Sequence, residues 1–149
     1  MPSGTIRLAS KSPSDAPLID PNYLASDEDL YALVDGVRLA RQIFTAPEFT
    51  PYGLSPWFPA ASSLAEDLTD EAIIAFIKAH AQTVYHPVGT CRMGAIEDPN
   101  TVVDPQCRVK GVQRLRVVDA SVMPNIIGGN TNAPTIMIAE KIAAHIMCE

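Results

Sequence analysis

The sequence of 149 residues lacks both a long apolar run and a leader-like start. A membrane-spanning helix needs about 20 consecutive apolar residues, and the apolar stretch Ala72–Ile77 is far shorter than that. The first residues, MPSGTIR, do not show the basic and then apolar pattern of a secretory signal. We therefore expect no transmembrane span.

Positive charge is also scarce. The 11 lysine and arginine residues are outnumbered by 17 aspartate and glutamate residues, which gives a formal net charge of −6. Proteins that bind nucleic acid usually gather lysine and arginine to contact the phosphates, and this sequence has no such cluster. We therefore expect no nucleic-acid partner.

Cysteine is limited to Cys91, Cys107 and Cys148. An odd, widely spaced set argues for reduced thiols rather than a disulfide framework, and so for a cytoplasmic protein. Structural zinc sites contain closely paired ligands, and neither these cysteines nor His86 provide such a pair. We expect no metal site.

Two common nucleotide-binding signatures are absent, the phosphate loop G-x-x-x-x-G-K-[ST] and the dinucleotide fingerprint G-x-G-x-x-G. The nearest run, Ile127–Asn130, matches neither of them. A turn that binds nucleotide phosphates would therefore have to come from outside these residues.

Three segments have the periodicity of amphipathic helices. The first begins after Ser26, a typical N-cap residue with Asp29 at the capping-box distance, and ends before Pro47. The second begins after Thr69 and frays near residues 80–82, and the third spans about residues 132–147. Their expected inward positions are Leu30, Leu33, Val34, Val37, Ala40, Arg41 and Phe44, then Ile73, Ile74, Phe76 and Ile77, then Ile136, Ala139, Ile142, Ala143 and Ile146.

The remaining segments are loops and short β-compatible pieces. Thr5–Ala9 alternates like a strand, and residues 10–22 form a loop rich in proline, aspartate and serine. Residues 47–63 form a loop whose aromatic side chains either pin it to the protein or line a ligand pocket: Phe49, Tyr52, Trp57 and Phe58. Short β-like pieces lie between glycine and proline turns: Val84–Tyr85, Val102–Val103, Arg108–Val109 and Leu115–Val118.

His86 is the histidine most suited to chemistry. It lies in a turn-rich segment in which Pro87 restricts the backbone, and Gly89 and Gly94 allow close backbone approach. A histidine on a stiff backbone suits general acid–base catalysis. His80 and His145 lie on expected helices, where a surface or partly packed imidazole is the simpler interpretation.

A second polar cluster, GGNTNAPT (Gly128–Thr135), directly precedes the third helix. Helix starts present N–H groups and a partial positive charge of about half a unit, which favours an anion or a group that becomes negative. Capping of the helix by Thr131 or Asn132 explains the same residues without a ligand. The pattern by itself leaves both interpretations open.

Four ordered motifs together resemble the glucose–methanol–choline (GMC) flavoprotein oxidoreductases. They are HPVGTCRMG (His86–Gly94), VVDPQCRV (Val102–Val109), LRVVDASVMP (Leu115–Pro124) and GNTNAPTIMIAEK (Gly129–Lys141). The sequences of these motifs are most similar to those of choline dehydrogenases and acceptor-linked alcohol dehydrogenases, and the resemblance covers essentially the whole chain.

The resemblance is to the C-terminal part of these proteins only. It implies an α+β fold, in which residues 1–109 contribute to an antiparallel sheet of the substrate-binding domain and residues 110–149 return to the FAD-binding side. The N-terminal FAD-binding half of the family has no counterpart here, so we expect a truncated product, an incomplete reading frame or one piece of a split enzyme. Without that half, apolar surface could lie exposed and the chain could self-associate.

The resemblance also implies roles for individual residues. His86 corresponds to the active-site histidine and Asn130 to the second active-site position, with an alcohol as substrate. The FAD-contacting positions correspond to Asp119, Ala120, Thr131 and Asn132. His86 would accept the hydroxyl proton while the alcohol carbon delivers hydride to flavin N5. Two alternatives stay open: a hydroxynitrile lyase on the same scaffold, and a non-catalytic remnant.

Overall fold

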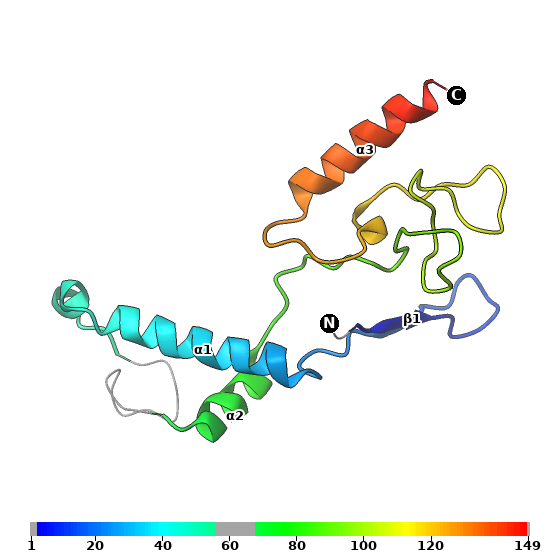
Figure 1. Ribbon diagram of the computed structural model, residues 1–149. Helices are drawn as coiled ribbons and strands as arrows, with labels where there is room; N and C mark the ends of the chain where they lie inside the picture. Colours follow the sequence, from blue (N-terminus) through cyan, green and yellow to red (C-terminus); the bar gives the residue numbers. More distant parts are fainter. Residues whose placement is uncertain (1–2, 56–67, 149) are drawn as a thin grey trace. The chain divides into compact units, whose positions relative to one another are not determined.

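The computed structural model describes residues 3–55 and 68–148, and it has the α+β fold that we expected. The chain divides into two compact units, with the boundary between Gln82 and Thr83. Figure 1 shows the strand β1 and the helices α1 and α2 of the first unit, and the helix α3 of the second. The functional boundary expected between residues 109 and 110 concerns substrate and cofactor contacts, and it stays a prediction.

A two-stranded antiparallel sheet lies near the start of the first unit. Strand β1 (Thr5–Arg7) pairs with β2 (Leu18–Asp20), so that Ile6 lies opposite Ile19. The structure confirms the strand expected within Thr5–Ala9 and places it at Thr5–Arg7. The expectation that residues 10–22 are all loop is wrong, because a strand of three residues between prolines is too short for an alternating pattern to indicate it.

Helix α1 (Asp27–Phe44) begins after Ser26 and ends before Pro47, as predicted. The expected capping box is wrong, because the Ser26 side chain makes no capping hydrogen bond. Three acidic residues in the first turn instead complement the positive end of the helix. Leu30 and Val34 are the buried side chains of α1, whereas Leu33 and Phe44 remain largely exposed.

Helix α2 (Asp70–His80) packs against α1 and completes the core of the first unit. Its N-cap is Thr69, as predicted, and the Thr69 hydroxyl accepts a hydrogen bond from the Ala72 N–H at 3.3 Å. Ile74 and Phe76 are partly buried, rather than fully buried. The buried core consists of Leu30, Val34, Leu68, Ile73 and Ile77.

The segment after α1 is more regular than we expected. Residues Pro47–Tyr52 form a 3-10 helix, η1, because Pro47 fixes a compatible backbone at its first turn. The Phe49 ring lies 5.4 Å from that of Phe44, which supports the interpretation that this segment is pinned by its aromatic residues. Trp57 and Phe58 lie outside the described residues, so the pocket alternative stays a prediction.

The second unit contains little regular structure before its final helix. Val103 forms isolated β-bridges with Met93 and Val109, and Arg108 forms one with Arg116. Three of the expected β-like pieces therefore exist only as single bridges. The piece at Val84–Tyr85 is wrong, because Tyr85 adopts a left-handed backbone with φ 61°.

Helix α3 (Asn132–Ile146) closes the second unit (Figure 1). Together with the 3-10 helix η2 (Ala120–Val122) it surrounds a small core of Val103, Cys107, Val122 and Ile142. The expected buried stripe of α3 is wrong for most of its length, since Ile136 is 55% and Ile146 is 44% exposed. A core this small covers only one short part of the helix. Within the described residues, no helix is long and apolar enough to cross a membrane.

Candidate active site

His86 and Thr131 form the contact around which the candidate site is built. The His86 Nδ1 atom lies 3.0 Å from the Thr131 hydroxyl oxygen, although the two residues are 45 positions apart in the sequence. Thr131 is buried, with 7% exposure, and His86 is half-buried. The contact joins the histidine motif to the GGNTNAPT cluster, which the sequence could only relate by resemblance.

The backbone brings these two segments together. The Cys91 N–H donates to the Ser121 carbonyl at 3.0 Å, and the Met93 N–H donates to the Val122 carbonyl at 2.9 Å. Val122 belongs to the buried core that also contains Ile142 of α3. The histidine motif, η2 and α3 are therefore held by one connected set of hydrogen bonds and apolar contacts.

The backbone next to His86 is strained. Tyr85 has a φ of 61°, a region that bulky residues rarely adopt, and its N–H donates to the Thr83 hydroxyl at 3.0 Å. Gly89 has a φ of 86°, which only glycine adopts easily. Positive φ also occurs at Asn22, Leu24, Cys107 and Arg114, so this strain is not confined to the His86 segment.

Thr131 is the N-cap of α3, and it caps the helix without its side chain. Its carbonyl accepts bonds from the Thr135 N–H at 3.0 Å and from the Thr135 hydroxyl at 2.6 Å. Its hydroxyl makes no capping bond and contacts His86 instead. The capping interpretation is therefore correct for the backbone of Thr131, and its side chain is available for the site.

The start of α3 carries the other two polar residues of the cluster. Asn132 is the first residue of the helix and Asn130 precedes the cap, and both are exposed. The first N–H groups of any helix have no partner within it, and they carry a partial positive charge. An exposed, electropositive helix start with two carboxamides beside it can bind an electron-rich group.

Asp119 and Ala120, the other two predicted cofactor residues, lie at the start of η2. The Asp119 carboxylate accepts from the Ser121 N–H at 2.8 Å and from the Ser121 hydroxyl at 2.5 Å. Its side chain is therefore used to hold its own turn. Both bonds use Oδ1 of Asp119, and the resemblance implies that the contact with FAD at this position comes from the backbone.

The other two histidines have the ordinary surroundings that we expected. The His80 Nδ1 atom lies 3.0 Å from the Phe76 carbonyl oxygen, and its ring stacks on that of Phe76 with 4.4 Å between the centroids. His145 lies in the last turn of α3 and is exposed. Neither of them belongs to the contacts that hold His86.

Sequence reasoning missed the role of Asp104, which organises a turn within the motif Val102–Val109. Its Oδ1 atom accepts from the N–H groups of Gln106 and Arg108, both at 2.9 Å, and its Oδ2 atom accepts from Arg108 Nε at 2.7 Å. Burial raises the pKa of Asp104, but the hydrogen bonds from Arg108 and Gln106 outweigh burial, so this pKa lies below its ordinary value. The sequence signal was the Asp-Pro-x-x-Arg spacing, which favours a turn closed by its first side chain.

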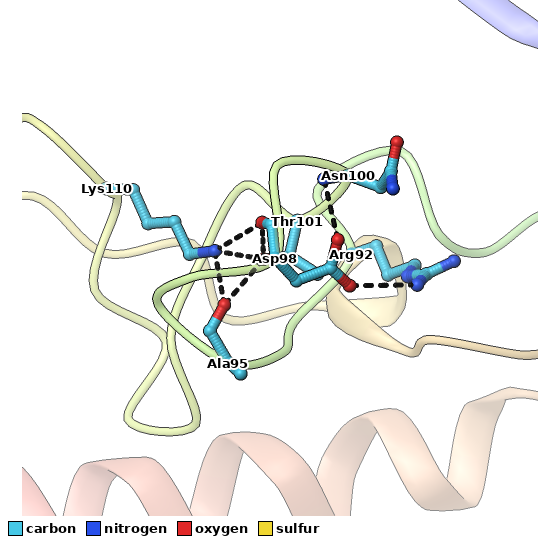
Figure 2. A network of polar contacts seen from close by, with 6 residues as sticks. All are labelled: Arg92, Ala95, Asp98, Asn100, Thr101 and Lys110. Atoms are coloured by element: carbon cyan, nitrogen blue, oxygen red, sulfur yellow. Dashed lines mark hydrogen bonds and ion pairs between the residues drawn. The ribbon is translucent and has the colours of Figure 1, made fainter.

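A second missed network is centred on Lys110 (Figure 2). The Lys110 ammonium group donates to the Ala95 carbonyl at 2.6 Å, to the Asp98 carbonyl at 2.9 Å and to the Thr101 hydroxyl. Asp98 in turn pairs with Arg92 of the histidine motif at 3.4 Å. The network fixes the loop that directly follows His86–Gly94, and no spacing rule could have indicated it.

A surface hollow of about 700 Å³ lies elsewhere in the second unit, at Ile96, Asp104 and residues 108–116. Four basic residues line it: Arg108, Lys110, Arg114 and Arg116. Arg108 is paired with Asp104, and Lys110 is held by the loop oxygens described above. None of the predicted site residues lines this hollow.

The three cysteines are free thiols in different surroundings. Cys107 is buried, Cys91 is half-buried and Cys148 is exposed. Burial, aided by the charge of Asp104, raises the pKa of the Cys107 thiol, which therefore stays protonated. Across residues 3–55 and 68–148, no three histidine, cysteine or acidic side chains gather as metal ligands would.

Comparison with known proteins identifies the family. The family model described as GMC oxidoreductase matches residues 1–139 of this chain. The chain belongs to the GMC oxidoreductase family. The resemblance stated from the four motifs is thus confirmed, including its restriction to the C-terminal portion.

Two curated GMC relatives and one solved structure show the extent of the similarity. The chain is 49% identical to "Alcohol dehydrogenase [acceptor]" of Pseudomonas putida over 97% of its own length and 25% of the relative's. It is 46% identical to human "Choline dehydrogenase, mitochondrial" over 94% of this chain and 23% of the relative. The structure of an FAD-dependent oxidoreductase from Chaetomium thermophilum superposes with a TM-score of 0.87, at 33% identity over 96% and 24% of the two chains. The chain spans about a quarter of these relatives' length.

Proposed function

We propose that this chain is the C-terminal catalytic portion of an FAD-dependent alcohol oxidoreductase. The observation that carries the proposal is the contact between His86 and Thr131, because it joins the histidine motif to the segment that contains Asn130 and the start of α3. The alcohol and choline dehydrogenases among the relatives support an alcohol as substrate. Since the chain spans a quarter of those relatives, the activity requires an FAD-binding portion in addition.

The residues of this chain fit the part of FAD that carries the reactive ring. Thr131 and Asn132 lead the electropositive start of α3, which would lie beside the ring, whereas the backbone at Asp119 and Ala120 would contact the diphosphate–ribityl region. The phosphate-binding turn would come from the other portion. When bound, FAD would supply the acceptor for a hydride, which carries two electrons.

His86 and Asn130 would act on the alcohol itself. The substrate hydroxyl would lie between the two side chains, and its O–H bond would break as the proton passes to the His86 imidazole. The hydrogen on the carbon that bears the hydroxyl would leave with both electrons of its C–H bond as hydride, for which bound FAD would be the acceptor, so that a carbonyl forms. The Asn130 carboxamide holds the oxygen in place and thereby orients the C–H bond.

The start of α3 has a separate task in this proposal. Bound FAD would gain negative charge when it accepts hydride, and the partial positive charge at Thr131 and Asn132 would stabilise negative charge placed beside it. The effect needs no side-chain movement, because the helix is fixed by the core contact of Ile142.

A chimera provides the test. We would replace the matching quarter of the Pseudomonas putida alcohol dehydrogenase with this chain, purify the yellow protein and add a primary alcohol without oxygen. We expect the flavin absorbance to bleach. Asn130→Ala should slow bleaching by about 10- to 100-fold while FAD stays bound, because orientation is lost but the base remains.

The outcomes separate the competing functions. Cleavage of a cyanohydrin without any bleaching by alcohols would identify a lyase instead. A chimera that binds FAD but performs neither reaction would identify a non-catalytic remnant.

The free cysteines further support a cytoplasmic, reducing compartment as the place where the protein works.

A further inference from the structure

We propose that Thr131 is a positioning residue, which holds His86 in the tautomer that carries hydrogen on Nδ1. In this arrangement Nδ1–H donates to the Thr131 hydroxyl oxygen, and Nε2 keeps its lone pair as the atom that accepts the substrate proton. The inference rests on the proposed function for the catalytic role of Nε2. The tautomer itself is a property of this chain alone.

The geometry at Nδ1 of His86 supports this tautomer. The Thr131 hydroxyl oxygen lies at hydrogen-bond distance, 3.0 Å, from Nδ1 of His86. A neutral imidazole has one donor and one acceptor nitrogen, so once Nδ1 donates to Thr131, Nε2 is the acceptor. Because Thr131 is 7% exposed, water competes poorly for this bond.

The Thr131 hydroxyl is not used to cap its own helix. The hydroxyl oxygen of an N-cap threonine usually accepts a hydrogen bond from its own helix, as Thr69 does for Ala72 at the start of α2. Thr131 makes no such bond at the start of α3. Its oxygen is therefore not engaged by the helix and can accept from Nδ1–H of His86.

This tautomer is also compatible with proton transfer to Nε2. When His86 accepts a proton on Nε2, Nδ1 keeps its hydrogen, so the bond to Thr131 persists through the reaction. The hydroxyl oxygen then accepts from an imidazolium, and such charge-assisted bonds are roughly twice as strong as neutral ones. Thr131 thus stabilises the protonated histidine as well as orienting the ring.

The experiment reads the tautomer directly from the 149-residue chain. With ¹⁵N-labelled histidine and an alkaline solution, two-bond ¹H–¹⁵N correlations distinguish Nδ1–H from Nε2–H rings. His80 is an internal standard, because its Nδ1 faces the Phe76 carbonyl, which can only accept. We expect His86 to show the same Nδ1–H pattern as His80, and an Nε2–H pattern for His86 would overturn the proposal.

Variants at one helix start provide the controls. Thr131→Val keeps the shape and removes the hydroxyl, so His86 should lose the pure Nδ1–H pattern, and Thr131→Ser should restore it. Thr135→Val removes the neighbouring hydroxyl that bonds only to the Thr131 backbone, and it should leave His86 unchanged. If Thr131→Val leaves the His86 pattern unchanged, Thr131 does not set the tautomer.

Flavin reduction in the chimera separates this proposal from the proposed function. Thr131→Val should slow reduction by about 10- to 100-fold, the range seen when a partner that orients a histidine is removed, and Thr131→Ser should recover most of the rate. An Nδ1–H pattern in a chimera that never reduces flavin would contradict the proposed function only. The wrong tautomer in an active chimera would contradict the role of Thr131 only.

Discussion

The two units of the chain are organised by different means. The first unit buries apolar side chains of α1 and α2, such as Val34 and Ile73, between regular helices. The second unit holds an irregular backbone between Thr83 and Asn130 with isolated bridges and polar side chains such as Asp104 and Lys110. All the predicted site residues lie in the second unit.

The difference shows where each kind of interaction is useful. Regular helices bury apolar area efficiently, but they constrain every side chain to a fixed period. An irregular backbone can place single residues such as His86 in any direction, provided that its polar groups are satisfied. Asp104 and Lys110 satisfy those groups, and we expect each unit to be most sensitive to loss of its own kind of interaction.

The largest stability effect is expected in the helical core. Ile73→Ala removes a side chain that is 1% exposed and should lower the free energy of unfolding by about 3–4 kcal/mol, since it creates a cavity between α1 and α2. Urea unfolding followed by circular dichroism measures this loss. Leu39→Ala, at a 58% exposed position of α1, is the matched control and should change stability by less than about 0.5 kcal/mol. Similar losses for the two variants would contradict a core at Ile73.

The largest polar effect should come from Asp104 in the second unit. Asp104→Ala leaves the N–H groups of Gln106 and Arg108 without their acceptor, and should cost about 2–3 kcal/mol. Urea unfolding gives the value. Asp15→Ala, which removes a single bond to Ser10 in an exposed turn, should cost much less. Equal costs would show that the turn at residues 104–108 is not held by its carboxylate.

The same carboxylate predicts a pH dependence. Because the pKa of Asp104 is lower in the folded protein than in the unfolded chain, its contribution is complete above the unfolded pKa and disappears as the pH falls through the folded one. The stability difference between the native chain and Asp104→Ala should therefore shrink below about pH 4. A difference that stays constant down to pH 2 would contradict the lowered pKa.

Lys110→Met should have a smaller effect, confined to the loop in Figure 2. The ammonium group loses three oxygen partners on Ala95, Asp98 and Thr101, and the loss should be about 1–2 kcal/mol. Hydrogen exchange should accelerate at the Thr101 amide, which donates to Asp98. Lys141→Met, at an exposed position of α3, should leave this amide unchanged.

The smallest effect is expected for a surface ion pair of the first unit. The Arg38 Nη2 atom lies 2.5 Å from the Asp70 Oδ1 atom, but the two side chains are 49% and 40% exposed. Exposed pairs contribute little, so Arg38→Ala should change the free energy of unfolding by less than about 0.5 kcal/mol. A loss as large as that of Asp104→Ala would mean that exposure does not distinguish the ion pairs of the two units.

The sequence predicted the first unit better than the second because regular helices leave local signals in the sequence, whereas an irregular backbone depends on contacts between distant residues. Helical periodicity and N-cap residues located α1 and α2, because those signals are local. The short strand β2 and the exposed face of α3 escaped prediction, since both depend on what the segment packs against. In the site, His86 and Asn130 came from motifs, whereas the bond from His86 to Thr131 depends on the whole second unit. No local pattern encodes a contact between residues 45 positions apart.

The most direct test of the account is the rate of flavin reduction by an alcohol in the chimera after His86→Ala. We expect this rate to fall by about 10²- to 10⁴-fold, as for loss of a general base, while FAD stays bound. His80→Ala, which removes a packed histidine of the first unit, should leave the rate within about twofold of the unaltered chimera. Flavin reduction at an unchanged rate in the His86→Ala chimera would contradict the central claim that His86 accepts the substrate proton.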